Sequence, residues 1–231
     1  MRWSDLLFMH WPVKVSTLRS LVPANLEIDV FDGQAWLGVI PFLMSDVRPR
    51  FAPSVLAFRF PELNVRTYVR HRHKAGVWFF SLDAASHLAV WTARRFYHLP
   101  YQFAKMSTFS SGEFIEYQSQ RAGVPDAQLR CRYRPVGAPM HFHTGSLDSW
   151  LTDRYCLFAT NRSGEVFRGD IHHEPWPLQP AEVEIQANTM TAPLGLALPR
   201  EMPLLHFAKR LDVHAWSLTR CGVPASEDLQ G

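Results

Sequence analysis

Short segments in which apolar and polar residues alternate dominate this sequence, and turn signals separate them. Residues 26–30 alternate with a period of two, Asp32 and Gly33 follow, and residues 35–42 form a second apolar run. Because an Asp-Gly pair supplies the positive φ angles of a type I′ turn, we predict a β-hairpin here. The 17 prolines also interrupt any long helix, so a sheet is expected rather than a helical bundle.

The same signals recur along the rest of the chain. Further strands are predicted over residues 55–60, 62–70, 77–82, 114–121, 129–133, 155–159, 165–172 and 211–218. Short helices are predicted over residues 17–22, 84–96 and 147–154, and parallel β-α-β order is absent from this pattern. Closure removes the exposed edges of such a sheet, so we predict an α+β fold that is mainly antiparallel β, closed or nearly closed.

The chain is long enough and apolar enough to bury one large core. It has 231 residues, of which 47% are hydrophobic, and we predict a single domain over residues 1–231 with an ordered core from about 3 to 221. Only four of its 24 basic residues are lysines, namely Lys14, Lys74, Lys105 and Lys209. Chemistry that needs an amine nucleophile therefore has four candidates.

Charge and cysteine content argue against several classes of protein. The net charge of +3 arises from interleaved signs, which indicates neither a nucleic-acid footprint nor a polybasic membrane patch. No stretch approaches the ~18 consecutive apolar residues of a spanning helix, and no signal peptide is evident. Cys131, Cys156 and Cys221 lack a CxxC spacing, so we expect free thiols in a cytoplasmic protein.

One predicted strand places three polar side chains together. The period of two puts Glu62, Asn64 and Arg66 on one face, with Glu62 and Arg66 about 13 Å apart along the strand. If this face lines a barrel interior, its charges are costly to bury and a bound ligand is a natural way to satisfy them. If the face instead meets water, the apolar residues between them point to the core and no ligand is needed.

Histidine pairs raise the question of a metal. His71 and His73, and likewise His141 and His143, are spaced to share a strand face, as in some β-barrel metal sites. Their charged and proline neighbours favour solvated loops instead, so no metal site is predicted. The sequence also lacks a nucleophile elbow and a glycine-rich phosphate loop, and no cofactor is predicted.

Several longer motifs resemble a known family. They lie at residues 10–13 (HWPV), 18–23 (LRSLVP), 31–38 (FDGQAWLG), 62–69 (ELNVRTYV), 99–101 (LPY) and 153–155 (DRY). These runs resemble the bacterial YqjF-like family, a domain of unknown function, over nearly the whole chain. That family is in turn similar to acetoacetate decarboxylase, which implies a cone-shaped antiparallel barrel around a hydrophobic pocket.

The resemblance to the decarboxylase fails at its nucleophile. Where the decarboxylase has two adjacent lysines after a proline, one of them forming the Schiff base, this chain has Tyr101 and Gln102. Neither side chain can form an imine, and Lys105 is expected at the surface, so the decarboxylase mechanism is not implied. Glu62 matches a pocket glutamate, which favours an inward-facing strand, whereas a second pocket acid falls near Gly38 and is missing.

The resemblance leaves three functions to weigh. The preferred one is a barrel that binds a small organic acid or carbonyl metabolite, enclosed by aromatic residues such as Trp36, Phe80 and Trp216, with any catalytic activity left open. A scaffold role rests only on exposed aromatic residues.

The alternative is an enzyme of lyase or hydrolase type that works without lysine. Glu62 and Tyr101 would act as acid and base, and Arg66 or Arg154 would clamp a carboxylate or carbonyl. Asn64 and Gln102 complete the expected ligand contacts. The sequence leaves open the ligand, any reaction and the oligomeric state, a homo-oligomer included.

Overall fold

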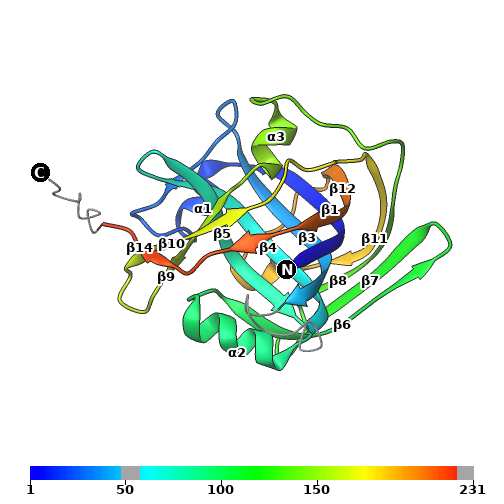
Figure 1. The fold of residues 1–231 in the computed structure, drawn as a ribbon, viewed down its shortest axis with the longest axis horizontal. Helices are drawn as coiled ribbons and strands as arrows, with labels where there is room; N and C mark the ends of the chain where they lie inside the picture. Colours follow the sequence, from blue (N-terminus) through cyan, green and yellow to red (C-terminus); the bar gives the residue numbers. More distant parts are fainter. Residues whose placement is uncertain (48–57, 223–231) are drawn as a thin grey trace, which may run out of the picture.

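Fourteen strands form one sheet in the computed structural model, which describes residues 1–47 and 58–222 (Figure 1). The main path runs β11-β8-β7-β6-β5-β4-β3-β1-β12. Its strands are β1 (Arg2–Val13), β3 (Ala35–Val47), β4 (Phe58–His71), β5 (Lys74–Ala84), β6 (Tyr101–Ser111), β7 (Phe114–Arg121), β8 (Gln128–Pro135), β11 (Ala181–Asn188) and β12 (Leu204–Asp212). Off this path lie β2 (Glu27–Ile28), β9 (Cys156–Thr160), β10 (Val166–His172), β13 (His214–Ala215) and β14 (Thr219–Arg220).

Helices are few and short in this part of the chain. They are α1 (Val15–Arg19), α2 (His87–Phe96) and α3 (Leu147–Thr152), with one 3-10 turn, η2 (Ala192–Leu194). None of the described helices is long and apolar enough to cross a membrane. The prediction of a mainly antiparallel sheet with a few helices is confirmed.

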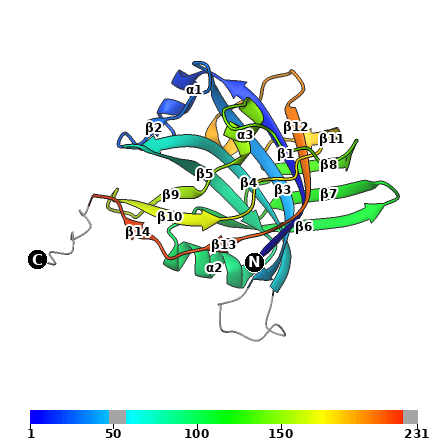
Figure 2. The same cartoon turned by 45° about the horizontal axis from the view of Figure 1, so that its top comes forward.

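The sheet coils on itself but is not closed. Its end strands β11 and β12 do not pair along their length. An isolated bridge between Gln179 and Phe207, with two backbone hydrogen bonds of 2.8 Å, ties the segment before β11 to β12. The β6–β7 hairpin projects beyond the rest of the sheet in both views (Figures 1 and 2). The strands between these two ends curve around a buried core.

The central strands are buried on both faces because packed side chains cover each side of the sheet. On one side lies a first core that includes Phe8, Phe42 and Tyr101. On the other side lies a second core, which includes Leu63 and Tyr117. Alternation along these strands therefore does not separate a wet face from a dry one.

Strands β5 and β6 are parallel, and α2 connects them. Leu82 pairs with Tyr101 in this parallel register. The Ser86 side chain caps α2 by accepting a hydrogen bond from the backbone of Ala89 at 3.3 Å. The prediction that parallel order is absent was therefore wrong, and β6 was not among the predicted strands.

The local turn at Asp32 and Gly33 was predicted correctly, but its pairing was not. Both residues have positive φ, and the backbones of Phe31 and Gln34 exchange hydrogen bonds of 2.9 Å across the turn. Strand β2, however, pairs with β4 rather than with β3. The predicted hairpin therefore reduces to its turn.

Other strand predictions differ from the structure or are not tested by it. Strands β1 and β11 were not expected, since β1 is buried on both faces and shows no clean alternation. The last long strand is β12, which begins earlier than the strand predicted over residues 211–218. Residues 55–57 of another predicted strand lie outside the described residues.

Candidate functional site

The polar face of β4 is buried rather than exposed to water. Glu62, Asn64 and Arg66 are 2%, 5% and 9% exposed, and the neighbouring even-numbered Tyr68 is fully buried. The alternative in which this face meets water is therefore wrong. The strand brings an acid, an amide and a guanidinium into the interior, where each requires a compensating partner.

Glu62 finds its partner on β6. The Tyr101 hydroxyl donates a 2.8 Å hydrogen bond to Oε2 of Glu62, and both side chains are buried. The pKa of Glu62 is raised to about 8, mainly by burial and to a lesser extent by the charge of Asp83, while the hydrogen bond from Tyr101 opposes the rise. Burial also raises the pKa of Tyr101 well above its ordinary value. At neutral pH the pair is therefore mainly uncharged.

A carboxyl group with these properties can exchange a proton near neutral pH. Its pKa lies close to the pH at which a cell operates, which is the condition for efficient general acid or base action. The backbone carbonyl of Glu62 is itself fixed, because the Tyr117 hydroxyl of β7 donates to it at 2.7 Å. Tyr101 therefore holds the side chain of Glu62, and Tyr117 holds its backbone.

Arg66 occupies the other end of the polar face and lacks an acidic partner among the described residues. Its Nη2 lies 3.4 Å from both the Tyr68 hydroxyl and the Leu151 carbonyl, which are long contacts for a charged donor. Its Nε is buried without a hydrogen-bond partner. The guanidinium also lies 5.6 Å from the centroids of the Phe8 and Tyr68 rings. Aromatic contacts thus replace the carboxylate that a buried arginine usually has.

His10 of β1 completes this basic end. Its Nε2 lies 2.7 Å from the Tyr68 hydroxyl oxygen. Burial lowers the pKa of His10 well below its ordinary value, and the charge of Arg66 lowers it further. The imidazole is therefore neutral at physiological pH. His10 was not a predicted site residue, although it begins one of the motifs that carry the family resemblance.

Gly38 of β3 is paired with His10 and leaves room for its ring. A Cβ at Gly38 would lie 3.1 Å from His10 Cδ2 and 2.8 Å from the side chain of Ile40. The resemblance to the decarboxylase placed a missing acid near Gly38. The His10 imidazole occupies the space that such a side chain would need.

The structure brings Arg154 to the basic end but gives it a structural partner. Its Nη1 donates to Asp29 at 2.7 Å, and its Nε donates to the Trp150 carbonyl at 2.7 Å. The guanidinium lies 4.9 Å from the centroid of the Tyr68 ring, a ring that Arg66 also contacts. Its Nη2 remains buried and unpaired.

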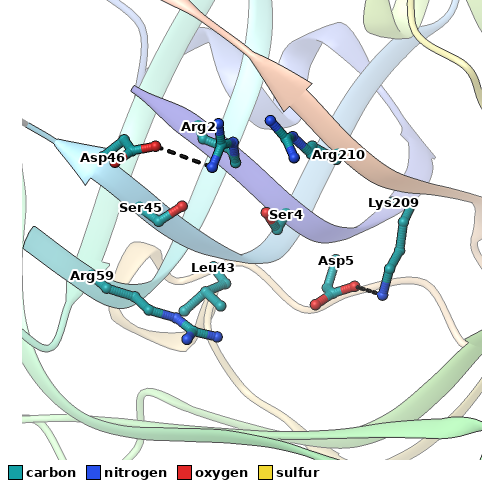
Figure 3. A pocket seen from close by; sticks show the side chains of 9 residues that line it. All are labelled: Arg2, Ser4, Asp5, Leu43, Ser45, Asp46, Arg59, Lys209 and Arg210. Atoms are coloured by element: carbon teal, nitrogen blue, oxygen red, sulfur yellow. Dashed lines mark hydrogen bonds and ion pairs between the residues drawn. The ribbon is translucent and has the colours of Figure 1, made fainter. Parts of the chain in front are cut away.

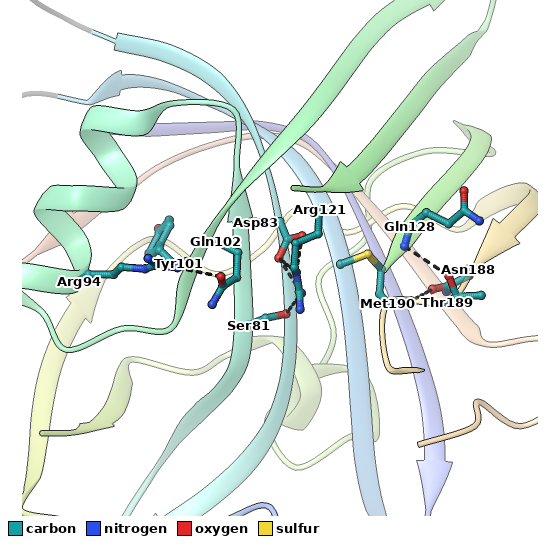
Figure 4. Close-up of polar contacts among 10 residues, drawn as sticks. All are labelled: Ser81, Asp83, Arg94, Tyr101, Gln102, Arg121, Gln128, Asn188, Thr189 and Met190. Atoms are coloured by element: carbon teal, nitrogen blue, oxygen red, sulfur yellow. Dashed lines mark hydrogen bonds and ion pairs between the residues drawn. The ribbon is translucent and has the colours of Figure 1, made fainter. Parts of the chain in front are cut away.

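Of the two other predicted ligand contacts, Gln102 lies apart from this face, whereas Trp36 lies near its basic end. Gln102 accepts a 2.7 Å hydrogen bond from Arg94 of α2 through Oε1, on the exposed side of β6 (Figure 4). Trp36 is half-buried and packs beside Tyr68 in a small separate cluster.

The predicted aromatic lining of the pocket is not found at Trp216 or Phe80, whereas the predicted surface position of Lys105 is confirmed. Trp216 is 54% exposed, so the prediction that it encloses a pocket was wrong. Phe80 packs against the second core rather than the first. Lys105 is exposed, as predicted.

A buried ion pair between Arg121 of β7 and Asp83 of β5 was not predicted. Asp83 lies on the face of β5 opposite to Leu82. Arg121 donates to both carboxylate oxygens of Asp83, at 2.8 to 3.2 Å, and to the Ser81 hydroxyl at 2.7 Å (Figure 4). The pair is fully compensated, in contrast to Arg66. Its components lie on strands far apart in sequence, so no sequence motif announces it.

Two cavities can be delimited on the surface of the described residues. The larger, about 440 Å³, opens beside Arg2, Asp5, Arg59 and Lys209 (Figure 3). The smaller, about 280 Å³, lies along β6 to β8 beside Lys105. Neither is lined by Glu62, Arg66 or Tyr101. Within residues 1–47 and 58–222, no three His, Cys, Asp or Glu side chains gather in a metal-binding arrangement.

A family model described as an uncharacterized conserved protein, domain of unknown function 2071, matches residues 1–212. The chain belongs to this family. YqjF of Bacillus subtilis (strain 168), itself uncharacterized, is 49% identical over 219 residues, which cover 94% of this chain and 90% of YqjF. The predicted membership of the family is therefore confirmed.

Two solved structures have a fold similar to that of this chain. The enduracididine biosynthesis enzyme MppR, complexed with pyruvate, is similar with a TM-score of 0.65 and 10% identity, covering 95% of this chain and 88% of MppR. Acetoacetate decarboxylase from Legionella pneumophila has a TM-score of 0.58 and 12% identity, covering 96% and 88% of the two chains. At these identities the likeness concerns the fold alone, and it supports the acetoacetate decarboxylase-like cone.

Proposed function

We propose that this protein binds a small organic acid on the buried polar face of β4, with Arg66 holding the carboxylate. The observation that carries the proposal is that Arg66 is buried, has an unpaired Nε and has no acidic partner among the described residues. An uncompensated buried cation is costly, and a carboxylate supplies two acceptor oxygens to a guanidinium. A charged ligand therefore stabilises what the folded chain leaves unpaired.

The acidic end of the face is compatible with such a ligand. Glu62, with its pKa of about 8, is mainly neutral at pH 7 and does not repel a carboxylate. Tyr101 and Gln102 occupy the positions that resemble the decarboxylase lysines, so the ligand is held without an imine. MppR, which shares the fold, was solved with pyruvate, and this supports the class of ligand proposed here.

Calorimetric titration at pH 7 tests the proposal with propionate, pyruvate and propionamide as probes. Both acids are expected to bind, whereas propionamide, the uncharged counterpart of propionate, is not. Arg66→Met removes the guanidinium and is expected to weaken propionate binding at least tenfold, the loss expected for a charge-assisted hydrogen bond. Arg162→Met, which changes an exposed arginine in a turn, is the matched control.

Equal binding of propionate and propionamide would contradict the proposal. So would an Arg66→Met variant that is folded and binds propionate as the wild type does.

A second candidate function is catalysis by the Glu62–Tyr101 pair. Its support is the 2.8 Å hydrogen bond together with a carboxyl pKa of about 8, a combination suited to proton transfer. The test is to incubate the protein with a panel of oxo and hydroxy acids and to follow them by NMR. Turnover that Glu62→Gln and Tyr101→Phe abolish supports catalysis, and turnover that both variants retain refutes this assignment.

A further inference from the structure

Two buried histidines of the first-core side each have one ring nitrogen engaged and the other unpaired. His10 and His206 are 0% and 4% exposed. In both rings Nε2 has a polar neighbour, whereas Nδ1 is buried without a hydrogen-bond partner among residues 1–47 and 58–222. Buried polar atoms without partners are rare in folded proteins and call for an explanation.

The hydrogen bonds of Tyr68 fix which nitrogen of His10 carries the proton. The Tyr68 hydroxyl has one hydrogen, and the Leu151 carbonyl, 2.7 Å away, can only accept it. The hydroxyl oxygen must therefore accept from Nε2–H of His10. Because burial keeps His10 neutral, its Nδ1 presents a lone pair.

His206 of β12 reaches the same state through an acidic partner. Its Nε2 lies 2.8 Å from Oδ1 of Asp148 in α3, and a carboxylate accepts a hydrogen bond there. Burial lowers the pKa of His206 despite the opposing effect of Asp148, so the ring is neutral at pH 7. Its Nδ1 is a second buried lone pair.

Strand register brings the two histidines to the basic end of the polar face. His206 pairs directly with Phe8, and His10 lies two residues beyond Phe8 on the same face of β1. The backbones of such diagonal neighbours are roughly 7 to 8 Å apart, a span that one small molecule can bridge. The Phe8 ring also contacts the Arg66 guanidinium.

The unpaired atoms define what would satisfy them. Arg66 Nε and Arg154 Nη2 are donors, whereas Asn64 Oδ1 and the two imidazole Nδ1 atoms are acceptors. A simple carboxylate would satisfy the donors alone. The acceptors require a second group on the ligand that carries a hydrogen.

We infer that the organic acid of the proposed function is a hydroxy acid, whose carboxylate pairs with Arg66 and whose hydroxyl donates to the Nδ1 of His206 or His10. This inference rests on the proposed function and narrows its ligand class. An oxo acid offers only acceptors and leaves both lone pairs unpaired. An amino acid would bring its ammonium group beside Arg66 and Arg154, where like charges repel.

Wild-type protein tests the inference directly by titration with matched probes at pH 7. Lactate is compared with propionate and pyruvate, and 3-hydroxybutyrate with butyrate. The hydroxy acid of at least one set is expected to bind about tenfold more tightly than its matched acids, the ratio of one added neutral hydrogen bond. This comparison needs no variant, so it holds even if a substitution prevents folding.

Variants at His206 assign the preference to its ring. His206→Leu removes the acceptor and is expected to abolish the preference for the hydroxy acid while propionate still binds. His206→Asn keeps an amide acceptor near the Nδ1 position and is expected to restore part of it. His214→Leu, at an exposed histidine of β13, is the control. If the preference survives in folded His206→Leu, the His10→Leu variant decides whether the other ring provides it, and survival in both variants overturns the inference.

The outcomes separate the two proposals. If the wild type binds acids through Arg66 but prefers neither hydroxy acid, the inference is wrong, whereas the proposed function stands. If no acid of the panel binds, both are overturned.

Discussion

The hydroxyl of Tyr101 reaches Glu62 across the parallel junction of β5 and β6. Tyr101 pairs with Leu82 of β5, and Leu82 pairs with Asn64 of β4. The 2.8 Å hydrogen bond from Tyr101 to Glu62 therefore crosses the intervening strand β5. The crossover through α2 thus brings the first residue of β6 over an acid that lies 39 positions earlier. Experiments that probe the Glu62–Tyr101 hydrogen bond therefore also probe the parallel pairing of β5 with β6.

Glu62 should make the stability of the fold depend on pH. Its folded-state pKa of about 8 exceeds the ordinary value of 4.5, so the folded protein binds more protons than the unfolded chain between these values. The free energy of unfolding of the wild type, relative to Glu62→Gln, should fall by roughly 3–5 kcal/mol as pH rises from about 4.5 to about 8. Urea unfolding of both proteins across this range measures the difference, and a flat difference would contradict the burial of an ionisable Glu62.

Tyr101→Phe should raise the pKa of Glu62 above about 8. The Tyr101 hydrogen bond lowers that pKa, so its removal leaves the effect of burial unopposed. Infrared difference spectra follow the protonated carboxyl band with pH, and Glu62→Gln identifies the band. An unchanged midpoint would show that the hydroxyl does not bind the carboxylate form.

The Tyr101→Phe variant should also lose roughly 1–3 kcal/mol of stability, because a buried acceptor loses its donor.

Arg66→Met should destabilise the fold far less than Arg121→Met does. Arg121 is paired with Asp83, and its loss leaves that carboxylate buried and alone, a cost of about 3–5 kcal/mol. Arg66 has no such partner among the described residues, so an apolar side chain of similar length should cost little or even stabilise the fold. Thermal unfolding of the two variants without ligand measures both effects. Equal destabilisation would indicate that Arg66 has a structural role.

Gly38 and His10 should be energetically coupled. An added Cβ at Gly38 meets the His10 ring at 3.1 Å and must displace it or the flexible end of Ile40. Gly38→Ala should therefore destabilise the wild type by roughly 1–3 kcal/mol and cost less when His10→Ala has already removed the ring. A double-mutant cycle from urea unfolding measures the coupling. Additive effects would show that the ring does not occupy this space.

Local elements were predictable from the sequence wherever a strand or helix carries its own signal. Residues 114–121 alternate between two turn signals, and β7 has these bounds. The helix predicted over residues 147–154 is α3, which Ser146 caps by accepting a hydrogen bond from the backbone of Ser149. In both cases neighbouring residues determine the structure, so a short window contains the information.

Partners distant in the chain were not predictable. Residues 101–106 look like part of a polar loop, because nothing nearby shows that α2 returns this segment to β5 in parallel. Strand β1 is buried on both faces, which removes the alternation by which a strand is recognised. Glu62 and Tyr101 were both candidates from the family resemblance, but their hydrogen bond depends on that parallel register.

The two histidines of the basic end were the residues that sequence reasoning missed. His10 and His206 lie at opposite ends of the chain, and only the pairing of β1 with β12 makes them neighbours. Arg66 was a candidate from its place on the strand, and its contacts are with Tyr68, Leu151 and Phe8. The site therefore has two separate ends along β4 rather than one point of convergence.

The close approach of the His10 ring to Gly38 also limits how such a site can change over generations. An added side chain at position 38 would crowd the imidazole and displace the end of Ile40, so in a lineage that carries His10 we expect a side chain at position 38 only together with a smaller residue 10. Within the family, the residues at these two positions are therefore expected to vary together.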